Sequence, residues 1–122
     1  MKAVRGSLVV AAMVAALGSE ARAGGALVTA PMIPGPGGAI VCSITNASGV
    51  AQTVTVEVFD DSGSAENTQS NQTLAPGGVL EVSGSDSARF CRFTGASRRT
   101  VRAAACVFDV SATRCIAVSP AS

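Results

Sequence analysis

Hydrophobic and polar residues alternate in two neighbouring stretches of the chain, I-V-C-S-I-T at 40–45 and T-V-T-V-E-V at 53–58. A period of two is typical of a half-buried β-strand, because successive side chains point to opposite faces. Asn46-Ala47-Ser48-Gly49 follows the first stretch and has turn composition. The pattern therefore predicts a β-hairpin in which Cys42 shares a face with Ile40 and Ile44.

The rest of the chain repeats this pattern of short apolar runs separated by turn residues. We expect strands near 26–30, 73–74, 79–82, 90–93, 101–108 and 115–118, with the 90–93 and 101–108 strands forming a hairpin across 95–100. Residues 31–38, rich in Pro and Gly, should form an extended edge or linker, and residues 60–70 a polar loop. No segment has the i, i+3, i+4 spacing of an amphipathic helix. The prediction is an all-β fold, an antiparallel β-sandwich of seven to eight short strands or an open barrel.

The first residues have the three parts of a secretory signal peptide. Lys2 and Arg5 precede an uncharged run from Ser7 to Gly18, and Ala21-Arg22-Ala23 matches an A-x-A cleavage site. The uncharged run is shorter than the ~20 residues that span a bilayer, although a buried or anchoring N-terminal helix is the alternative. We predict a signal peptide at 1–23, a single β-sandwich domain at 24–122, a secreted or periplasmic location, and no membrane span after cleavage. Arginine fully replaces lysine after the leader, which favours a bacterial source.

Four cysteines lie beyond the leader: Cys42, Cys91, Cys106 and Cys115. An even number in a short exported chain predicts two disulfides, and the gaps do not match the close pairs of a zinc site. A short hairpin between Cys106 and Cys115 would place those two side by side, which leaves Cys42 for Cys91. The competing pairing joins Cys91 to Cys106 and Cys42 to Cys115.

The composition excludes several classes of catalytic and metal-binding site. Residues 24–122 contain no His, Lys, Tyr or Trp, so Ser-His-Asp and Cys-His catalysis and histidine metal sites are excluded there. Six basic and seven acidic residues give this segment a net charge of about −1, with no global attraction to nucleic acid or anionic membranes. We expect neither enzymatic activity nor a cofactor.

Five of the six arginines after the leader lie within fourteen residues. Clustered guanidinium groups suit the capture of phosphate or carboxylate, such as those of an acidic envelope polymer. The alternative is a solvated hairpin tip, and the scarcity of aromatic residues argues against nucleic acid. We expect the cluster to be exposed and not to line a pocket. The candidate anion-binding residues are Arg89, Arg92, Arg98, Arg99 and Arg102.

Two weaker patterns have simple structural explanations. Asp60, Asp61, Glu66 and Asn67 carry the oxygen ligands that calcium prefers, but they lack the spacing of an EF-hand and also suit a solvated turn. Asn46-Ala47-Ser48 matches a glycosylation acceptor, and we interpret Asn46 as a turn residue.

The run N-A-S-G-V-A-Q-T-V-T-V-E-V-F-D-D-S-G, followed by L-A-P-G-G, resembles bacterial extracellular immunoglobulin-like modules. The chain is also similar to small secreted bacterial proteins in which a cysteine-bearing strand precedes this pattern and an F-C-R-F segment follows it. The resemblance covers about residues 38–108 and implies a non-catalytic extracellular β-sandwich, although the Trp and Tyr of antibody domains are missing. We therefore expect an exported binding or structural module, whose partner would be an envelope protein or an anionic polymer. One alternative is a dedicated anion binder that uses the arginine-rich hairpin, and another is a carboxylate hydrolase.

Overall fold

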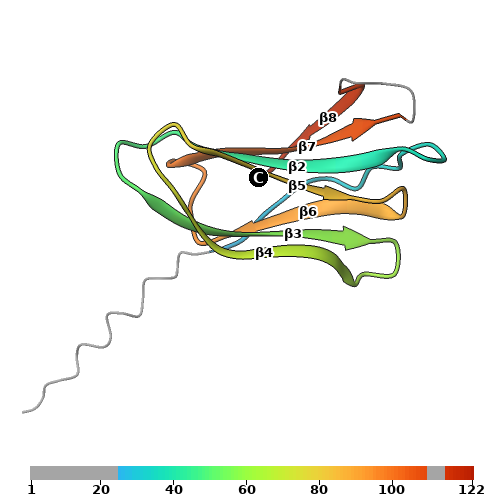
Figure 1. Cartoon of the computed structure of the whole chain (residues 1–122), viewed down its shortest axis with the longest axis horizontal. Coiled ribbons are helices and arrows are strands. Elements are labelled where there is room, and N and C mark those ends of the chain that lie inside the picture. The colour runs from blue at the N-terminus through green and yellow to red at the C-terminus, as the bar shows by residue number, and fades with distance from the viewer. Residues whose placement is uncertain (1–24, 110–114) are drawn as a thin grey trace, which may run out of the picture.

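The computed structural model describes residues 25–109 and 115–122, and in this part of the chain eight β-strands form two antiparallel four-stranded sheets (Figure 1). The predicted leader at 1–23 lies outside the described residues. In spatial order the first sheet contains β1 (Leu27–Val28), β6 (Ala88–Thr94), β3 (Gln52–Asp60) and β4 (Ala65–Leu74). The second contains β5 (Val79–Gly84), β2 (Ala39–Asn46), β7 (Val101–Phe108) and β8 (Ala117–Pro120). The predicted all-β sandwich is confirmed, and no helix in the described ranges is long and apolar enough to span a membrane.

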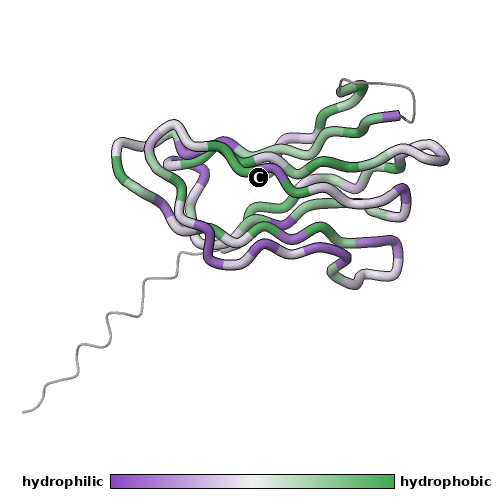
Figure 2. The backbone as a smooth tube through the Cα atoms, viewed as in Figure 1, coloured by the Kyte–Doolittle hydropathy of each residue, from purple (hydrophilic) through white to green (hydrophobic). Residues whose placement is uncertain are grey.

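The core lies between the sheets and is built from the alternating positions that the sequence indicated. Ile40, Cys42 and Ile44 point inward from β2, and Val54, Val56 and Val58 point inward from β3, all at most 1% exposed. Figure 2 shows hydrophobic residues along β2, whereas β4 is mainly hydrophilic. Burying each of these Ile and Val side chains contributes about 1.5–3 kcal/mol to stability.

Two of the predicted hairpins, the one over residues 40–58 and the one over residues 90–108, are wrong, whereas β7 and β8 do pair as the expected hairpin between Cys106 and Cys115 requires. β2 pairs with β5 and β7, whereas β3 pairs with β4 and β6, so β2 and β3 belong to different sheets. β6 and β7 are likewise divided between the sheets. In both cases the two consecutive strands bury their apolar faces against each other across the core instead of pairing side by side in one sheet.

The predicted polar loop at 60–70 is also wrong, because β4 begins at Ala65. This strand lies at a sheet edge and buries only Leu74 fully, so its sequence has no apolar alternation to reveal it. Its ladder with β3 is interrupted by two register shifts, and Asn71 at one of them has a φ of 53°. Such bulges twist an edge strand and interrupt its pairing.

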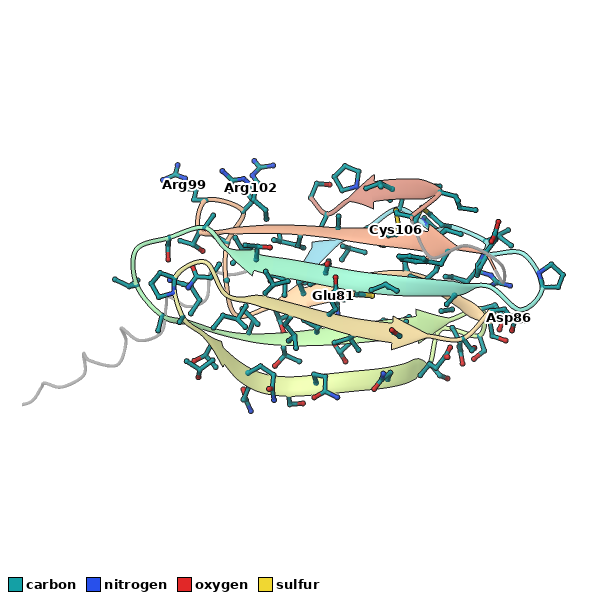
Figure 3. The ribbon with its side chains drawn as sticks, turned by 45° about the horizontal axis from the view of Figure 1, so that its top comes forward. Glu81, Asp86, Arg99, Arg102 and Cys106 are labelled. Atoms are coloured by element: carbon teal, nitrogen blue, oxygen red, sulfur yellow. A yellow bond between two sulfur atoms is a disulfide. The ribbon has the colours of Figure 1, made fainter. Side chains whose placement is uncertain are left out.

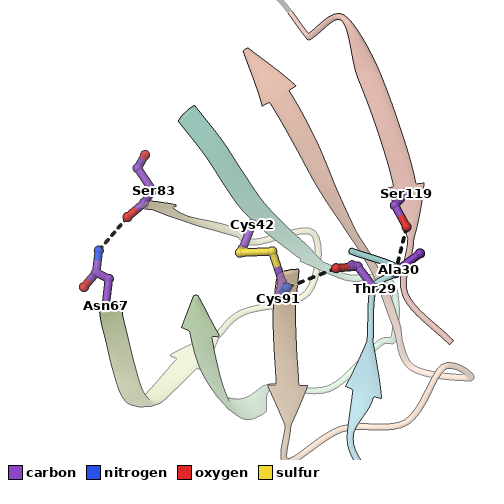
Figure 4. The surroundings of a disulfide bond; sticks show 7 residues. All are labelled: Thr29, Ala30, Cys42, Asn67, Ser83, Cys91 and Ser119. Carbon is purple, nitrogen blue, oxygen red and sulfur yellow. Dashed lines mark hydrogen bonds between the residues drawn. A yellow bond between two sulfur atoms is a disulfide. The ribbon is translucent and has the colours of Figure 1, made fainter. Parts of the chain in front are cut away.

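The structure contains the two predicted disulfides, Cys42–Cys91 and Cys106–Cys115. The first joins β2 of one sheet to β6 of the other, and both of its cysteines are 0% exposed (Figure 4). The hydroxyl of Thr29 accepts a hydrogen bond of 3.0 Å from the backbone N–H of Cys91 in the same region. The second joins the end of β7 to the residue that leads into β8. Two disulfides are characteristic of a non-reducing, extracellular environment.

Both open sides of the sandwich are bridged by hydrogen bonds. On one side the Asn67 amide donates to the Ser83 carbonyl at 2.8 Å, so a β4 side chain binds the backbone of β5 (Figure 4). On the other side Val28 and Ser122 exchange two backbone hydrogen bonds of 3.1 and 3.2 Å. The chain therefore leaves β8 after Pro120 and crosses to β1, which opens space beside the first residues of β7.

Candidate functional site

The loop between β6 and β7, residues 95–100, is held in a fixed conformation at one end of the sandwich. Gly95 has a φ of +97°, and a Cβ there would lie 2.5 Å from the carbonyl oxygen of Thr53. The Ser97 carbonyl accepts from the N–H groups of Thr100 and Val101 at 2.9 and 3.1 Å. The Thr100 carbonyl accepts from Ala47 N–H at 2.9 Å, which ties the loop to the β2–β3 connection. A non-glycine residue at position 95 is therefore disfavoured by both conformation and space.

The structure divides the five candidate arginines into two groups. Arg92 binds the Glu57 carboxylate through Nε and Nη2, both at 2.9 Å, and its guanidinium lies 4.7 Å from the centre of the Phe59 ring. Arg89 lies 3.6 Å from the Asp61 carboxylate and donates to the carbonyls of Asp86 and Ala88. These two arginines are neutralised by β3 and its following turn, so they do not join an anion site.

Arg98, Arg99 and Arg102 form the second group, which we call the basic cluster. All three are exposed, and Figure 3 shows Arg99 and Arg102 projecting from the same end of the molecule. None has a carboxylate partner among the described residues. Arg102 Nη1 donates to the carbonyls of Arg98 and Val101, both at 3.0 Å, which leaves its Nε and Nη2 donors available. These backbone contacts orient one guanidinium group before any ligand arrives.

A groove of about 450 Å³ lies beside the basic cluster, where β8 has diverged from β7. Arg98 and Arg102 border it, so the expectation that no arginine lines a pocket is wrong for these two, although the groove is open and both side chains remain exposed. Two hydroxyl side chains, Ser43 and Thr45, lie on the wall that β2 provides. The apolar lining consists of Leu27, Val101, Ala103, Ala104, Pro120 and Ala121.

A second hollow of about 220 Å³ adjoins the first and shares Leu27 and Arg98 with it. Arg98 therefore stands between two recesses that open at the same end of the sandwich. Sequence reasoning identified the arginines but missed the groove. The available signals were the run of small residues at 103–105 and the hydroxyls on the outward face of the 40–45 strand.

The opposite end of the molecule is acidic, and Figure 3 shows Asp86 there. Hydrogen bonds from the Ser62 hydroxyl and from the N–H groups of Ser64 and Ser62 lower the pKa of Asp60 from its ordinary value of 3.8. Glu66 instead accepts from the N–H of Ser85, and Asn67 binds the Ser83 carbonyl. The calcium candidates thus serve separate structural contacts, and no group of three metal-ligating side chains occurs among the described residues.

Comparison of the chain with protein-family models, with curated proteins and with solved structures found no match. Function must therefore be argued from the geometry of the site itself.

Proposed function

We propose that the chain is an exported, non-catalytic β-sandwich module that binds anionic polymers through the basic cluster. The observation that carries this proposal is the contrast between the two groups of arginines. Arg89 and Arg92 are paired with carboxylates, whereas Arg98, Arg99 and Arg102 are exposed at one end and have no such partner within residues 25–109 and 115–122. Exposed guanidinium groups bind phosphate, sulfate and carboxylate groups through charge-assisted, often bidentate hydrogen bonds.

Export and bacterial origin belong to the same proposal and rest on the leader pattern, the composition and the two disulfides. Mass spectrometry of the secreted or periplasmic protein tests the leader, since we expect a mature chain that starts at Gly24. A retained leader, or a start several residues away, would contradict this.

Membership among immunoglobulin-like domains is also proposed, and part of the topology supports it. The pairs β2–β5 and β3–β6 lie in separate sheets, and the buried disulfide joins the second strand to the sixth, as in antibody domains. The arrangement departs from that pattern at β7, which pairs with β2 and not with β6.

Retention on heparin and lipopolysaccharide resins tests the binding function. We expect the wild-type protein to be retained at low salt and to elute earlier as ionic strength rises, because exposed charge pairs are screened. R98Q/R99Q should elute at clearly lower salt. R89Q/R92Q removes the same number of charges from paired positions and is the matched control, so it should elute with the wild type.

Passage of the wild type straight through at low salt would favour a purely structural module. An equal shift in both double variants would show that net charge alone controls retention. Hydrolysis of an envelope polymer that one carboxylate substitution abolishes would revive the enzyme hypothesis.

A further inference from the structure

The groove beside the basic cluster has positive charge at its border and a mostly apolar lining. Arg98 and Arg102 lie on its border, and the rest of its lining is mostly apolar. Leu27 and Val101 are buried core residues, 9% and 1% exposed, so the groove reaches the edge of the hydrophobic core. A purely polar polymer would leave this apolar surface uncovered. The groove therefore suits a ligand with an apolar part, which the exposed arginines by themselves would not require.

The fold explains why the groove is open. β8 pairs with β7 only from Ala104 to Val107, although β7 begins at Val101. Ala121 N–H then binds the Ala103 carbonyl at 2.9 Å, and the chain turns away to pair with Val28. Because residues 103, 104 and 121 are all alanine, no large side chain fills the space that the diverging strand leaves.

The polar groups at the border are arranged for one anionic group. Arg102 is oriented by the carbonyls of Arg98 and Val101 and keeps free donors, and Arg98 forms no ion pair with another residue in the described ranges. Thr45 adds a hydroxyl donor on the adjacent wall, whereas the Ser43 hydroxyl donates to the Glu81 carboxylate at 3.4 Å. A carboxylate or phosphate bound here would receive charge-assisted hydrogen bonds beside an apolar surface.

We propose that the groove binds an amphipathic anion, with a single carboxylate or phosphate head at Arg98 and Arg102 and an apolar chain along Leu27, Ala103 and Ala104. This deepens the proposed function and rests on it, since both use the basic cluster. The inference concerns the groove, whereas polymer binding also uses Arg99, which does not line it. The two ideas can therefore fail separately.

Isothermal titration calorimetry with octanoate and with octyl phosphate tests the proposal and distinguishes the two heads. Acetate and inorganic phosphate supply the heads alone, and octyl glucoside supplies the same chain with a neutral head. We expect the matching head alone to bind at least about tenfold more weakly, which corresponds to burying two methylene groups. Octyl glucoside should also bind more weakly than the better of the two amphipathic anions.

The variants separate the groove from the polymer site. R98Q and R102Q should each weaken binding about tenfold through the loss of a charged hydrogen bond, whereas R99Q should leave it unchanged. Ala104→Leu and Ala121→Leu, checked for folding by circular dichroism, fill the groove from two walls. They should abolish binding of whichever amphipathic anion binds the wild type better, while heparin retention persists.

If neither octanoate nor octyl phosphate bound more tightly than its head alone, or if both leucine variants bound the better of the two as the wild type does, the groove inference would be overturned and the polymer-binding function would stand. If the wild-type protein were not retained on heparin at low salt, the proposed function itself would be contradicted.

Discussion

The side-chain amide of Asn46 donates a hydrogen bond of 2.9 Å to the carbonyl oxygen of Leu74, which lies 28 residues further along the chain. The same amide donates to the Val50 carbonyl at 2.8 Å, and its oxygen accepts from the N–H and hydroxyl of Ser48. Asn46 is 0% exposed. One buried side chain thus connects the ends of β2 and β4 and organises the β2–β3 connection.

We expect Asn46→Ala to lower the free energy of unfolding by about 1–3 kcal/mol, because it removes the side-chain donor to the buried Leu74 carbonyl. Urea denaturation measures the change. Ser48→Ala, which removes a more peripheral contact, is the comparison and should cost about 1 kcal/mol or less. A change below about 0.5 kcal/mol in Asn46→Ala, the range usual for surface substitutions, would contradict this role. Asn46-Ala47-Ser48 matches a glycosylation acceptor, but the Asn46 side chain is buried and stabilises the turn that follows β2.

The two disulfides should differ in stability contribution and in accessibility. The C42A/C91A variant should lose about 4 kcal/mol and C106A/C115A about 2.5 kcal/mol, since the first bridge closes the longer segment. Guanidinium denaturation checks the order. Under mild dithiothreitol, mass mapping should show Cys106–Cys115 reduced first, because its cysteines are half-buried whereas Cys42 and Cys91 are fully buried. Earlier reduction of Cys42–Cys91 would contradict this expectation.

Gly95→Ala should destabilise the protein by about 1–3 kcal/mol, because the residue has a φ of +97° and the added Cβ would meet the Thr53 carbonyl. It should also lower heparin retention by displacing the loop that carries Arg98 and Arg99. Gly49→Ala is the matched control, since a Cβ there meets nothing within 4 Å. Thermal denaturation of both variants provides the measurement, and equal melting temperatures would refute the constraint.

Arg92 should contribute to stability and not to binding. Its ion pair with Glu57 and its contact with Phe59 are partly exposed, so Arg92→Gln should cost about 1 kcal/mol. A double-mutant cycle with Glu57→Gln measures the coupling. If the two substitutions changed the free energy of unfolding additively, the ion pair would contribute nothing to stability.

Asp60 should make stability depend on pH in the acid range. Hydrogen bonds in the folded state lower its pKa below 3.8, so the unfolded state binds the proton more tightly. Its stabilising effect is therefore complete above the unfolded pKa and is lost as pH falls through the lower folded value. Asp60→Asn should show a smaller loss of stability below about pH 4, measured by urea denaturation across pH. An unchanged acid profile would contradict this.

The alternation at residues 40–45 and 53–58 predicted which faces are buried, but it could not predict which strands are neighbours. A period of two defines the direction of each side chain and carries no information about pairing, so β2 and β3 were wrongly joined. Only the last two residues of β4, 73–74, were predicted as a strand, because an edge strand that buries little beyond Leu74 has no apolar alternation. The division of the arginines was likewise hidden, since it depends on Glu57 and Asp61 being brought beside β6 by long-range pairing.

The disulfides join the first cysteine to the second and the third to the fourth along the chain. If the protein is exported, as proposed, and its N-terminus emerges first, each bridge can form with the next cysteine to emerge. Cys42 would meet Cys91 before Cys106 appears, and Cys106 would then find only Cys115 unpaired. A general dithiol oxidase would suffice for such a chain, with no need for an isomerase to correct mispaired intermediates.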